Sequence, residues 1–280
     1  SNVPVLECTI DRIIGGLLYL ENAHQQLRAS QIGPLIVYGY RLDTVIMSPS
    51  LLNTTLQEGH TPPYNPISSS HSNVLPMPML PKAKKFWPFA DLLFSIEYLK
   101  TFEFFHYLSH EDKKALIRHV SVMCSHLTLA FFSYENKSEV TLHPDGTRPH
   151  NGCVPTERAH EWQLHHGIIQ IVRHLELDKK EYVLLKALIV CNPAIEDLSC
   201  SHKDILEFER LKYSKSLMSY VLYRRGDEKG PAAFTTMIAI IDTLTHLMKK
   251  HKDWHILNQA LKYTPETVQE PSLFNDVYGY

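Results

Sequence analysis

Seventeen histidines and 30 acidic residues give this chain many side chains that could bind a metal ion or transfer a proton. The pattern nearest to a catalytic motif is His160-Glu161 followed by His165. A zinc-protease helix needs its two histidines four residues apart, because only then do both rings lie on one helix face. Here the second histidine comes one residue too late. We therefore expect ordinary surface or core histidines, and no metal site.

Cysteine and histidine do not combine into a nucleophile and its base either. Cysteine-serine-histidine runs begin at Cys124 and Cys200, but close neighbours on a helix point in different directions. The five cysteines are scattered, odd in number and without C-x-x-C spacing, which is typical of reduced thiols. Gly-rich phosphate loops and G-x-S-x-G are absent as well. Nothing here predicts an enzyme, and a helical metal-dependent enzyme is kept only as a remote alternative.

The composition is that of an ordinary globular protein, with 44% hydrophobic and 21% charged residues in a chain of 280. A formal net charge of -2 offers no basic excess to neutralise phosphates, which argues against direct binding of nucleic acid. No apolar run approaches the roughly 18 residues of a membrane span, and the N-terminus lacks a signal-peptide pattern. We expect a soluble, intracellular protein that does not enter a membrane.

The strongest structural pattern is a pair of apolar helices joined by a tight turn. The first is predicted over residues 88–107, and the second over residues 112–132. Ser109 lies three residues before Asp112, which suits a helix N-cap followed by an acidic first turn. The apolar stripe of the first helix consists of Leu92, Leu93, Ile96 and Leu99.

Further helices are predicted on both sides of this pair. They cover residues 9–29, 156–173, 178–191, 201–224 and 231–252, the last with a continuation towards 262. Asp178 or its neighbour is the expected cap of the third of these, and Asn192-Pro193 ends it, because the residue before proline avoids the helical region. Residues 226–231 form a break, and Pro231 suits the first position of the next helix.

Two stretches interrupt the helical pattern. Residues 30–81 form a long Pro-rich loop, whose length is typical of a functional lid or a mobile segment, with one short helix predicted at 51–58. Residues 139–149 read EVTLHPDGTRP, and the alternation of Val140 and Leu142 before Pro-Asp-Gly predicts a small β-hairpin. The result is an all-α protein of about ten helices with one small β-hairpin.

Three blocks of the sequence are similar to signatures of one protein family. Residues 98–117 contain a YLK, F, L, DK, LI pattern, residues 177–193 read LDKKEYVLLKALIVCNP, and residues 273–278 read LFNDVY. In these blocks the chain resembles the ligand-binding domain of a nuclear hormone receptor. The wording of residues 131–146 is closest to nematode receptors related to hepatocyte nuclear factor four. Departures from the pattern are Lys113 for glutamine and Ser121 for tryptophan.

The resemblance implies a three-layer antiparallel helical sandwich with a groove for an L-x-x-L-L coactivator helix. Lys100 would bind the carbonyl end of that helix, Asp276 would bind its amide end, and Arg118 would assist Lys100. The apolar side chains of the terminal activation helix, residues 271–280, are Leu273, Phe274 and Val277. Asp276 replaces the usual glutamate and is one methylene shorter, which puts constitutive activation in question.

The resemblance also implies a cavity for a lipophilic small molecule, with a fatty-acid-like compound among the candidates. The residues that would face this cavity are Asp91, Ser95, Val122, Ser125, Leu129, Phe132 and Asn258. Asp91 is either a polar ligand anchor or an exposed aspartate in the first turn of a helix. Phe132 stands where related receptors often hold an arginine for a carboxylate, so that anchor is missing. The cavity is either lipid-lined or filled by the protein's own side chains.

Partners follow from the same resemblance. The helix over residues 231–252 would supply a homodimer or heterodimer face, although its mildly polar stripe also suits burial within the fold. DNA would be bound only through a zinc-finger domain that is absent from this chain, and the nucleus is the expected location. No cofactor is expected. The main alternative is a ligand-independent orphan domain that acts as a constitutive scaffold or dimer partner.

Overall fold

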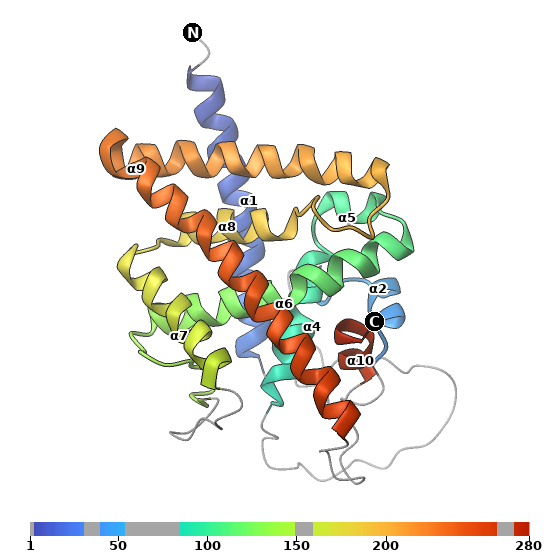
Figure 1. Ribbon diagram of the computed structural model, residues 1–280. Coiled ribbons are helices and arrows are strands. Elements are labelled where there is room, and N and C mark those ends of the chain that lie inside the picture. Colours follow the sequence, from blue (N-terminus) through green and yellow to red (C-terminus); the bar gives the residue numbers. More distant parts are fainter. Residues whose placement is uncertain (1–2, 31–39, 54–84, 149–158, 262–271, 280) are drawn as a thin grey trace, which may run out of the picture.

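The structure is a computed structural model that describes residues 3–30, 40–53, 85–148, 159–261 and 272–279 (Figure 1). Its helices are α1 (Val3–Ala29), α2 (Leu42–Met47), α4 (Trp87–Leu99), α5 (Glu103–Tyr107), α6 (His110–Glu135), α7 (Ala159–His174), α8 (Lys179–Val190), α9 (Cys200–Leu261) and α10 (Ser272–Tyr278). These described parts of the chain contain no strand. The predicted all-α fold is confirmed.

The helices form three layers. In the middle layer α6 packs against α8, and α6 also contacts α4, α7 and α9. α1 and α4 pack together and cover one side of this layer, while α7 and α9 pack together and cover the other. In Figure 1 the second half of α9 crosses in front of α6. This arrangement agrees with the predicted three-layer sandwich.

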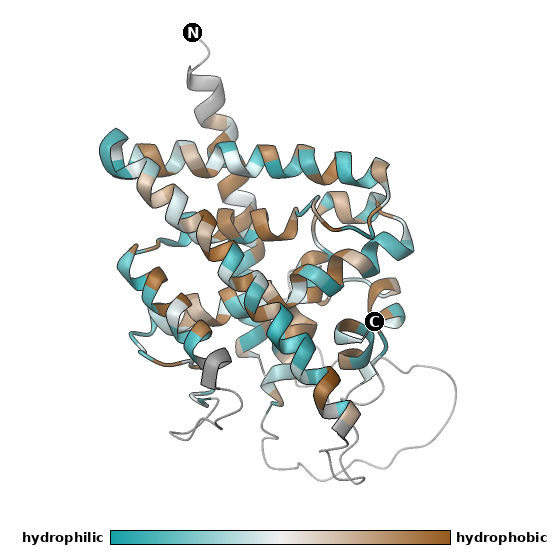
Figure 2. Ribbon diagram, in the orientation of Figure 1, coloured by the Kyte–Doolittle hydropathy of each residue, from teal (hydrophilic) through white to brown (hydrophobic). Residues whose placement is uncertain are grey.

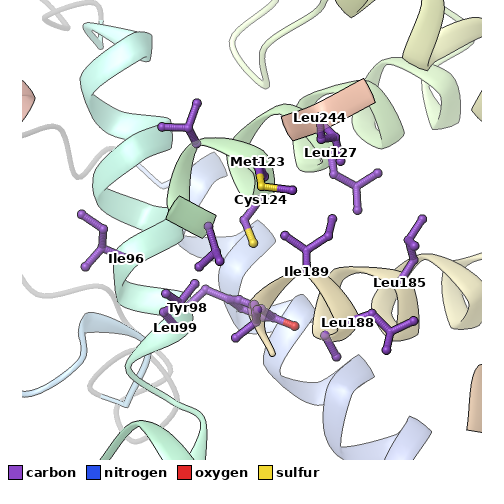
Figure 3. Close-up of a cluster of buried hydrophobic side chains, with 14 of the residues drawn as sticks. Ile96, Tyr98, Leu99, Met123, Cys124, Leu127, Leu185, Leu188, Ile189 and Leu244 are labelled. Carbon is purple, nitrogen blue, oxygen red and sulfur yellow. The ribbon is translucent and has the colours of Figure 1, made fainter. Parts of the chain in front are cut away.

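A single apolar core lies where the layers meet. Figure 3 shows Tyr98 and Leu99 of α4, Cys124 of α6 and Ile189 of α8 gathered in it, and each of these side chains is at most 1% exposed. Figure 2 shows that α8 is largely hydrophobic, whereas the first half of α9 carries many hydrophilic residues. Every residue of α8 from Glu181 to Val190 is buried, so α8 belongs in the middle layer.

Both predicted helix caps on which the sequence argument relied are present. The Ser109 side chain accepts a hydrogen bond from the Asp112 amide at the start of α6. Asp178 forms a capping box with Glu181 at the start of α8, in which each side chain bonds the other's backbone amide. α8 ends at Val190, two residues before Asn192-Pro193, as the proline rule predicts.

The single helix predicted over residues 88–107 is wrong, because the chain forms two helices there. α4 ends at Leu99 and α5 begins at Glu103. Phe102 between them has an extended backbone, with φ -76° and ψ 133°, and its side chain is 4% exposed. The turn therefore places another aromatic ring in the core, which a straight helix would point elsewhere.

The β-hairpin predicted over residues 139–149 is also wrong within the part that the structure describes, residues 139–148. A turn does form, since the His143 amide donates to the Thr147 carbonyl over 2.9 Å. The flanking backbone groups bond side chains instead of a partner strand: the Leu142 amide donates to Ser133 Oγ over 3.0 Å, and Ser138 Oγ donates to the Val140 carbonyl over 2.6 Å. The segment is thus pinned to α6 and forms no ladder.

α9 is two helical arms joined at Gly226. This glycine has φ 75° and ψ 171°, a backbone conformation that side chains disfavour, so the predicted break is confirmed at its first residue. The helix resumes directly afterwards, and Pro231 therefore lies inside the element and not at its first position. The inner face of the second arm is fully buried at Met237, Ile240 and Leu244.

The core also contains a fully buried ion pair. Lys186 Nζ of α8 lies 2.8 Å from Glu21 Oε2 of α1, and both side chains are 0% exposed. The Tyr182 hydroxyl donates to the other carboxylate oxygen of Glu21 over 3.0 Å, and the Lys186 ammonium lies 4.0 Å from the Tyr98 ring centroid. Each charge thus has a partner, which a buried charge requires.

Two helices, α6 and α9, are long and apolar enough to cross a membrane by length and composition alone. From the sequence alone we expected no apolar segment of that length. The apolar window of α6 is 72% buried against other helices, which is ordinary for a core helix. The expectation that no part of the chain enters a membrane stays a prediction.

Candidate helix-binding groove

Lys100 lies at the C-terminal end of α4, where its ammonium group meets the last carbonyls of α2. Lys100 Nζ donates to the Val45 carbonyl over 2.6 Å and to the Pro49 carbonyl over 3.3 Å. It also pairs with Glu97 at 3.1 Å, and the Lys100 side chain is 4% exposed. The final carbonyls of a helix have no partner within it. Lys100 therefore satisfies the carbonyl end of α2.

Asp276 of α10 binds the opposite end of the same short helix. Its Oδ2 accepts a hydrogen bond from the Leu42 amide over 2.8 Å and lies 3.1 Å from Arg41 Nε. The first amides of a helix are likewise unpaired and carry partial positive charge. Asp276 thus satisfies the amide end of α2, despite being one methylene shorter than glutamate.

Between these two groups, α2 turns its apolar face inward. Leu42, Val45 and Ile46 are between 2% and 9% exposed, whereas Met47 on the outer face is 77% exposed. Figure 1 shows α2 beside α10, in agreement with the contacts between them. The site is therefore a groove that binds a helix at both ends and buries one apolar side. We call it the Lys100–Asp276 groove.

Burial tunes the charges at the lysine end of the groove. It raises the pKa of Glu97, against the lowering effect of Lys100, and it lowers the pKa of Lys100, against the opposing effect of Glu97. Glu97 Oε2 also accepts from the Leu51 amide over 2.8 Å. The Lys100 ammonium has three N–H donors, so it can bind Glu97 and the Val45 and Pro49 carbonyls at the same time.

A third contact holds the outer side of α2. Asp43 Oδ1 lies 2.8 Å from Lys114 Nζ and 2.7 Å from His110 Nε2, both in the first turns of α6. These hydrogen bonds lower the pKa of Asp43, with Lys114 contributing most. The Asp43 side chain is 56% exposed, so the pair adds orientation more than stability.

Side chains and backbone of α10 hold this helix against the rest of the domain. Leu273 and Val277 are fully buried in the core, and the Phe274 ring lies 6.1 Å from the ring centroids of both Phe86 and Phe89. Arg118 Nε donates to the backbone carbonyl of Asp276 over 2.9 Å. The structure thus places Arg118 against α10, where it fixes the backbone of Asp276, and its assistance to Lys100 stays a prediction.

The residues predicted to face a ligand cavity lie around α4 and α6. Val122 and Leu129 are buried, and Ser125 Oγ donates to the Val122 carbonyl over 2.8 Å. Phe132 is half-buried. Asn258 belongs to α9, and its side chain lies outside the described residues. A surface hollow of about 460 Å³ beside Tyr107 and Phe208 holds none of the predicted ligand-binding residues.

Asp91 is neither exposed nor isolated. Its Oδ1 lies 3.0 Å from Arg28 Nε of α1, and its Oδ2 lies 3.3 Å from His143 Nδ1. Burial, the largest single influence, would raise the pKa of Asp91, but the charges and hydrogen bonds of Arg28 and His143 together outweigh burial and lower that pKa. The alternative of an exposed first-turn aspartate is therefore wrong.

Sequence reasoning missed Arg28. This residue is 1% exposed, and its guanidinium carbon lies 5.4 Å from the ring centroid of Phe132. Arg28 Nη2 and Ser95 Oγ are both buried and have no hydrogen-bond partner among the described residues. A basic residue in the last turn of a helix is ordinary, so its position carried no signal. A buried cation thus lies beside the position where the sequence predicted a missing anion anchor.

The remaining candidate chemistry does not gather into a site. No three side chains of the metal-binding types cluster among the residues that the structure describes. Burial raises the pKa of the Cys124 thiol to about 12, which leaves it protonated and unreactive. His165 bonds Thr141 Oγ1 at 2.9 Å, as a structural core histidine would.

The three-layer helical fold agrees with the family that the three sequence blocks resemble. The sequence model of the ligand-binding domain of nuclear hormone receptors matches residues 85–255. The chain therefore belongs to the nuclear hormone receptor family of transcription factors, as the three sequence blocks predicted. The nearer relation to hepatocyte nuclear factor four stays a prediction.

Similar curated proteins are nuclear hormone receptor family members of Caenorhabditis elegans. The member nhr-60 is 37% identical over 200 residues, which are 71% of this chain and 42% of that protein. The member nhr-209 is 32% identical over 272 residues, which are 95% of this chain and 62% of that protein. The chain thus spans between two-fifths and two-thirds of the length of these relatives.

Proposed function

We propose that this domain recruits a coactivator by binding its L-x-x-L-L helix in the Lys100–Asp276 groove. One observation carries the proposal: the groove holds a short helix, α2, with its amide end at Asp276 and its carbonyl end at Lys100. A coactivator helix of the same polarity would meet the same two groups, with its leucines in place of Leu42, Val45 and Ile46.

The groove depends on α10, and this dependence supplies a switch. Asp276 belongs to α10, and Arg118 fixes the carbonyl of that residue. If α10 leaves its place, the amide end of a bound helix loses its acceptor while Lys100 remains. Anything that favours the packed position of α10 therefore favours recruitment, through a shift in population.

The test uses a released variant, Val45→Ser with Ile46→Ser, in which α2 loses most of its apolar face. A fluorescent peptide containing L-D-T-L-L is titrated against this variant and against the same variant with Asp276→Ala or Lys100→Ala. We expect saturable binding that either substitution weakens about tenfold, which is about 1.4 kcal/mol. Asp253→Ala, an exposed carboxylate of α9, is the matched control. No binding by the released variant would overturn the proposal.

A second proposed function is the binding of a lipophilic ligand with a polar or anionic head group. Arg28 Nη2 and Ser95 Oγ support it, because they are buried without a hydrogen-bond partner among the described residues and such groups are rare. Arg28 would supply the cation that Phe132 does not, and Val122 and Leu129 would contact apolar parts of the ligand. Ser125, Phe132 and Asn258 stay predicted cavity residues.

Mass spectrometry of the purified domain under native conditions tests this second function. We expect a co-purified or added long-chain fatty acid to bind, and Ser95→Ala and Arg28→Gln to weaken binding. Arg12→Gln, an exposed arginine on α1, is the control. A domain that binds no fatty acid at any concentration would favour the alternative, a ligand-independent orphan receptor that acts as a scaffold or dimer partner.

Other properties of the receptor are proposed from the family alone. Dimerisation would use the arm of α9 over residues 231–252, where Ala239 and His246 are exposed and Thr236 and Thr243 are half-buried. DNA binding would reside in a zinc-finger domain outside residues 1–280, and the receptor would act in the nucleus. Sedimentation of the domain with and without Ala239→Glu tests the dimer face.

A further inference from the structure

We propose that α2 is a built-in competitor for the Lys100–Asp276 groove, so that the domain occupies its own coactivator site until a partner helix displaces α2. The inference rests on the proposed function, because it takes the groove to be the site for a helix supplied by another protein. It identifies the occupant in the same chain as Leu42–Met47.

The sequence of α2 has the pattern that such a groove selects. It reads LDTVIM, with Leu42 followed after two residues by Val45 and Ile46. This is an L-x-x pattern with two β-branched apolar residues in place of the last two leucines. All three of these side chains are buried, whereas Met47 is exposed. α2 therefore presents to the groove the same face that an L-x-x-L-L helix would present.

The contacts at the ends of α2 duplicate those expected for a partner. The Leu42 amide donates a hydrogen bond to Asp276, and the Val45 carbonyl accepts one from Lys100. A partner helix needs the same oxygen and the same ammonium group. The two helices cannot be bound together, so their binding is mutually exclusive.

The residues after α2 keep it near the groove. Ser50 Oγ donates to the Glu97 carbonyl over 2.8 Å, and the Leu51 amide donates to the Glu97 carboxylate over 2.8 Å. These bonds tether α2 without using Lys100 or Asp276, which we call the two clamp groups. A tethered segment competes at an effective concentration of about 1 mM. A groove with an intrinsic dissociation constant near 100 µM for α2 would then be about ten-elevenths occupied, which weakens an external peptide about tenfold.

The helix itself is short enough to be exchanged. α2 has six residues, and a helix of that length is not stable alone in water. Its helical form therefore depends on the groove. An external helix that is longer, and that ends in two leucines, can replace it without unfolding any of the three layers.

The competitor also indicates what the partner looks like. Asp43, the residue after Leu42, contacts Lys114 and His110 of α6. A partner with an acidic residue after its first leucine would regain this contact, so the favoured motif is L-acidic-x-L-L. A partner with lysine at that position would face Lys114 with a like charge.

The test compares wild type with the released variant, using the fluorescent L-D-T-L-L peptide. We expect the released variant to bind about tenfold more tightly, and the exposed control Met47→Ser to bind like wild type. Equal affinity of wild type and the released variant would overturn this inference and leave the proposed function intact. Failure of both to bind would overturn the proposed function and, with it, the inference.

A second variant covers the case in which the double substitution does not fold. Asp43→Lys loosens α2 from Lys114 without altering a buried residue, and we expect it to tighten peptide binding two- to fivefold. A labelled peptide of residues 40–50 should also bind the released variant and be displaced by L-D-T-L-L. Unchanged affinity in Asp43→Lys, together with no binding of the 40–50 peptide, would contradict the inference.

Discussion

Two buried lysines, Lys186 and Lys100, do different work in this domain. Lys186 is fully buried at the centre of the domain, and its ammonium group forms an ion pair with the carboxylate of Glu21 at 2.8 Å. Lys100 lies at the groove, 4% exposed, and two of its partners are backbone carbonyls of α2 and of the residues that follow it. Burial lowers the pKa of both lysines, in each case against a glutamate that raises it.

The difference lies in whether the partners can be exchanged. Glu21 belongs to α1, so replacing it would require the core to open. The carbonyls that Lys100 binds belong to a six-residue helix, and any other helix end offers equivalent oxygens. A buried lysine is therefore a structural element where its partner is a side chain of the core, and a recognition element where its partner is the end of a removable helix.

The largest expected effect is a loss of stability when the structural lysine, Lys186, is replaced. Lys186→Ala leaves the carboxylate of Glu21 buried without a counter-charge, and we expect urea unfolding to show a loss of about 3–5 kcal/mol. The exposed Lys180→Ala on the same helix should cost less than about 0.5 kcal/mol. Replacing the pair by Glu21→Leu with Lys186→Met should restore most of the stability. A small loss in Lys186→Ala would mean that Glu21 is solvated or paired in another way.

The next effect is a pH dependence that His24 of the same cluster confers. Burial, together with the nearby ammonium of Lys186, lowers the pKa of His24 from 6.5 to about 4. The unfolded chain therefore binds a proton at a higher pH than the folded protein, and stability falls as the pH falls from 6.5 to 4. The shift corresponds to about 3 kcal/mol.

The measurement is the free energy of unfolding of wild type and His24→Asn at pH 7 and pH 4.5. Asparagine keeps an acceptor near the Lys186 ammonium but does not titrate. We expect the difference between the two proteins to shrink as the pH is lowered. Parallel pH profiles for the two proteins would assign the loss of stability to other histidines.

The smallest expected effect is a preference of the groove for one peptide sequence over another. In the released variant, L-D-T-L-L should bind two- to threefold more tightly than L-K-T-L-L, because an exposed ion pair with Lys114 contributes about 0.5 kcal/mol. Lys114→Glu should reverse this preference, while Lys137→Glu, a charge change beyond the end of α6, should not. A preference that survives Lys114→Glu would place the acidic residue elsewhere.

Local signals explain what the sequence could predict about the fold. Ser109 and Asp178 mark helix starts through bonds with residues three positions away, Asn192-Pro193 marks an end through the restriction on the residue before proline, and the structure has those ends. The hairpin over residues 139–149 failed for the opposite reason. Its turn depends on local residues and does form, but a hairpin also needs its two strands to pair. The Leu142 amide donates to Ser133 of α6 instead of to a partner strand.

The groove shows the same limit. Lys100 and Asp276 were found from family blocks, whereas α2 was missed, because a six-residue helix without a side-chain cap gives no periodic signal. The predicted helix at 51–58 lies mostly outside the described residues, although residues 51–53 are helical. The pairs Arg28–Asp91 and Glu21–Lys186 join residues 63 and 165 positions apart, and such contacts leave no trace in spacing.

The central claim is that α2 and a partner helix use the same two clamp groups. Hydrogen exchange of the wild-type domain tests it most directly, measured on the amides of Leu42–Met47 with and without saturating L-D-T-L-L peptide. We predict that these amides lose protection when the peptide binds, while those of α10 keep or gain it. Bound peptide with unchanged protection of α2 would contradict the claim and place the partner elsewhere on the domain.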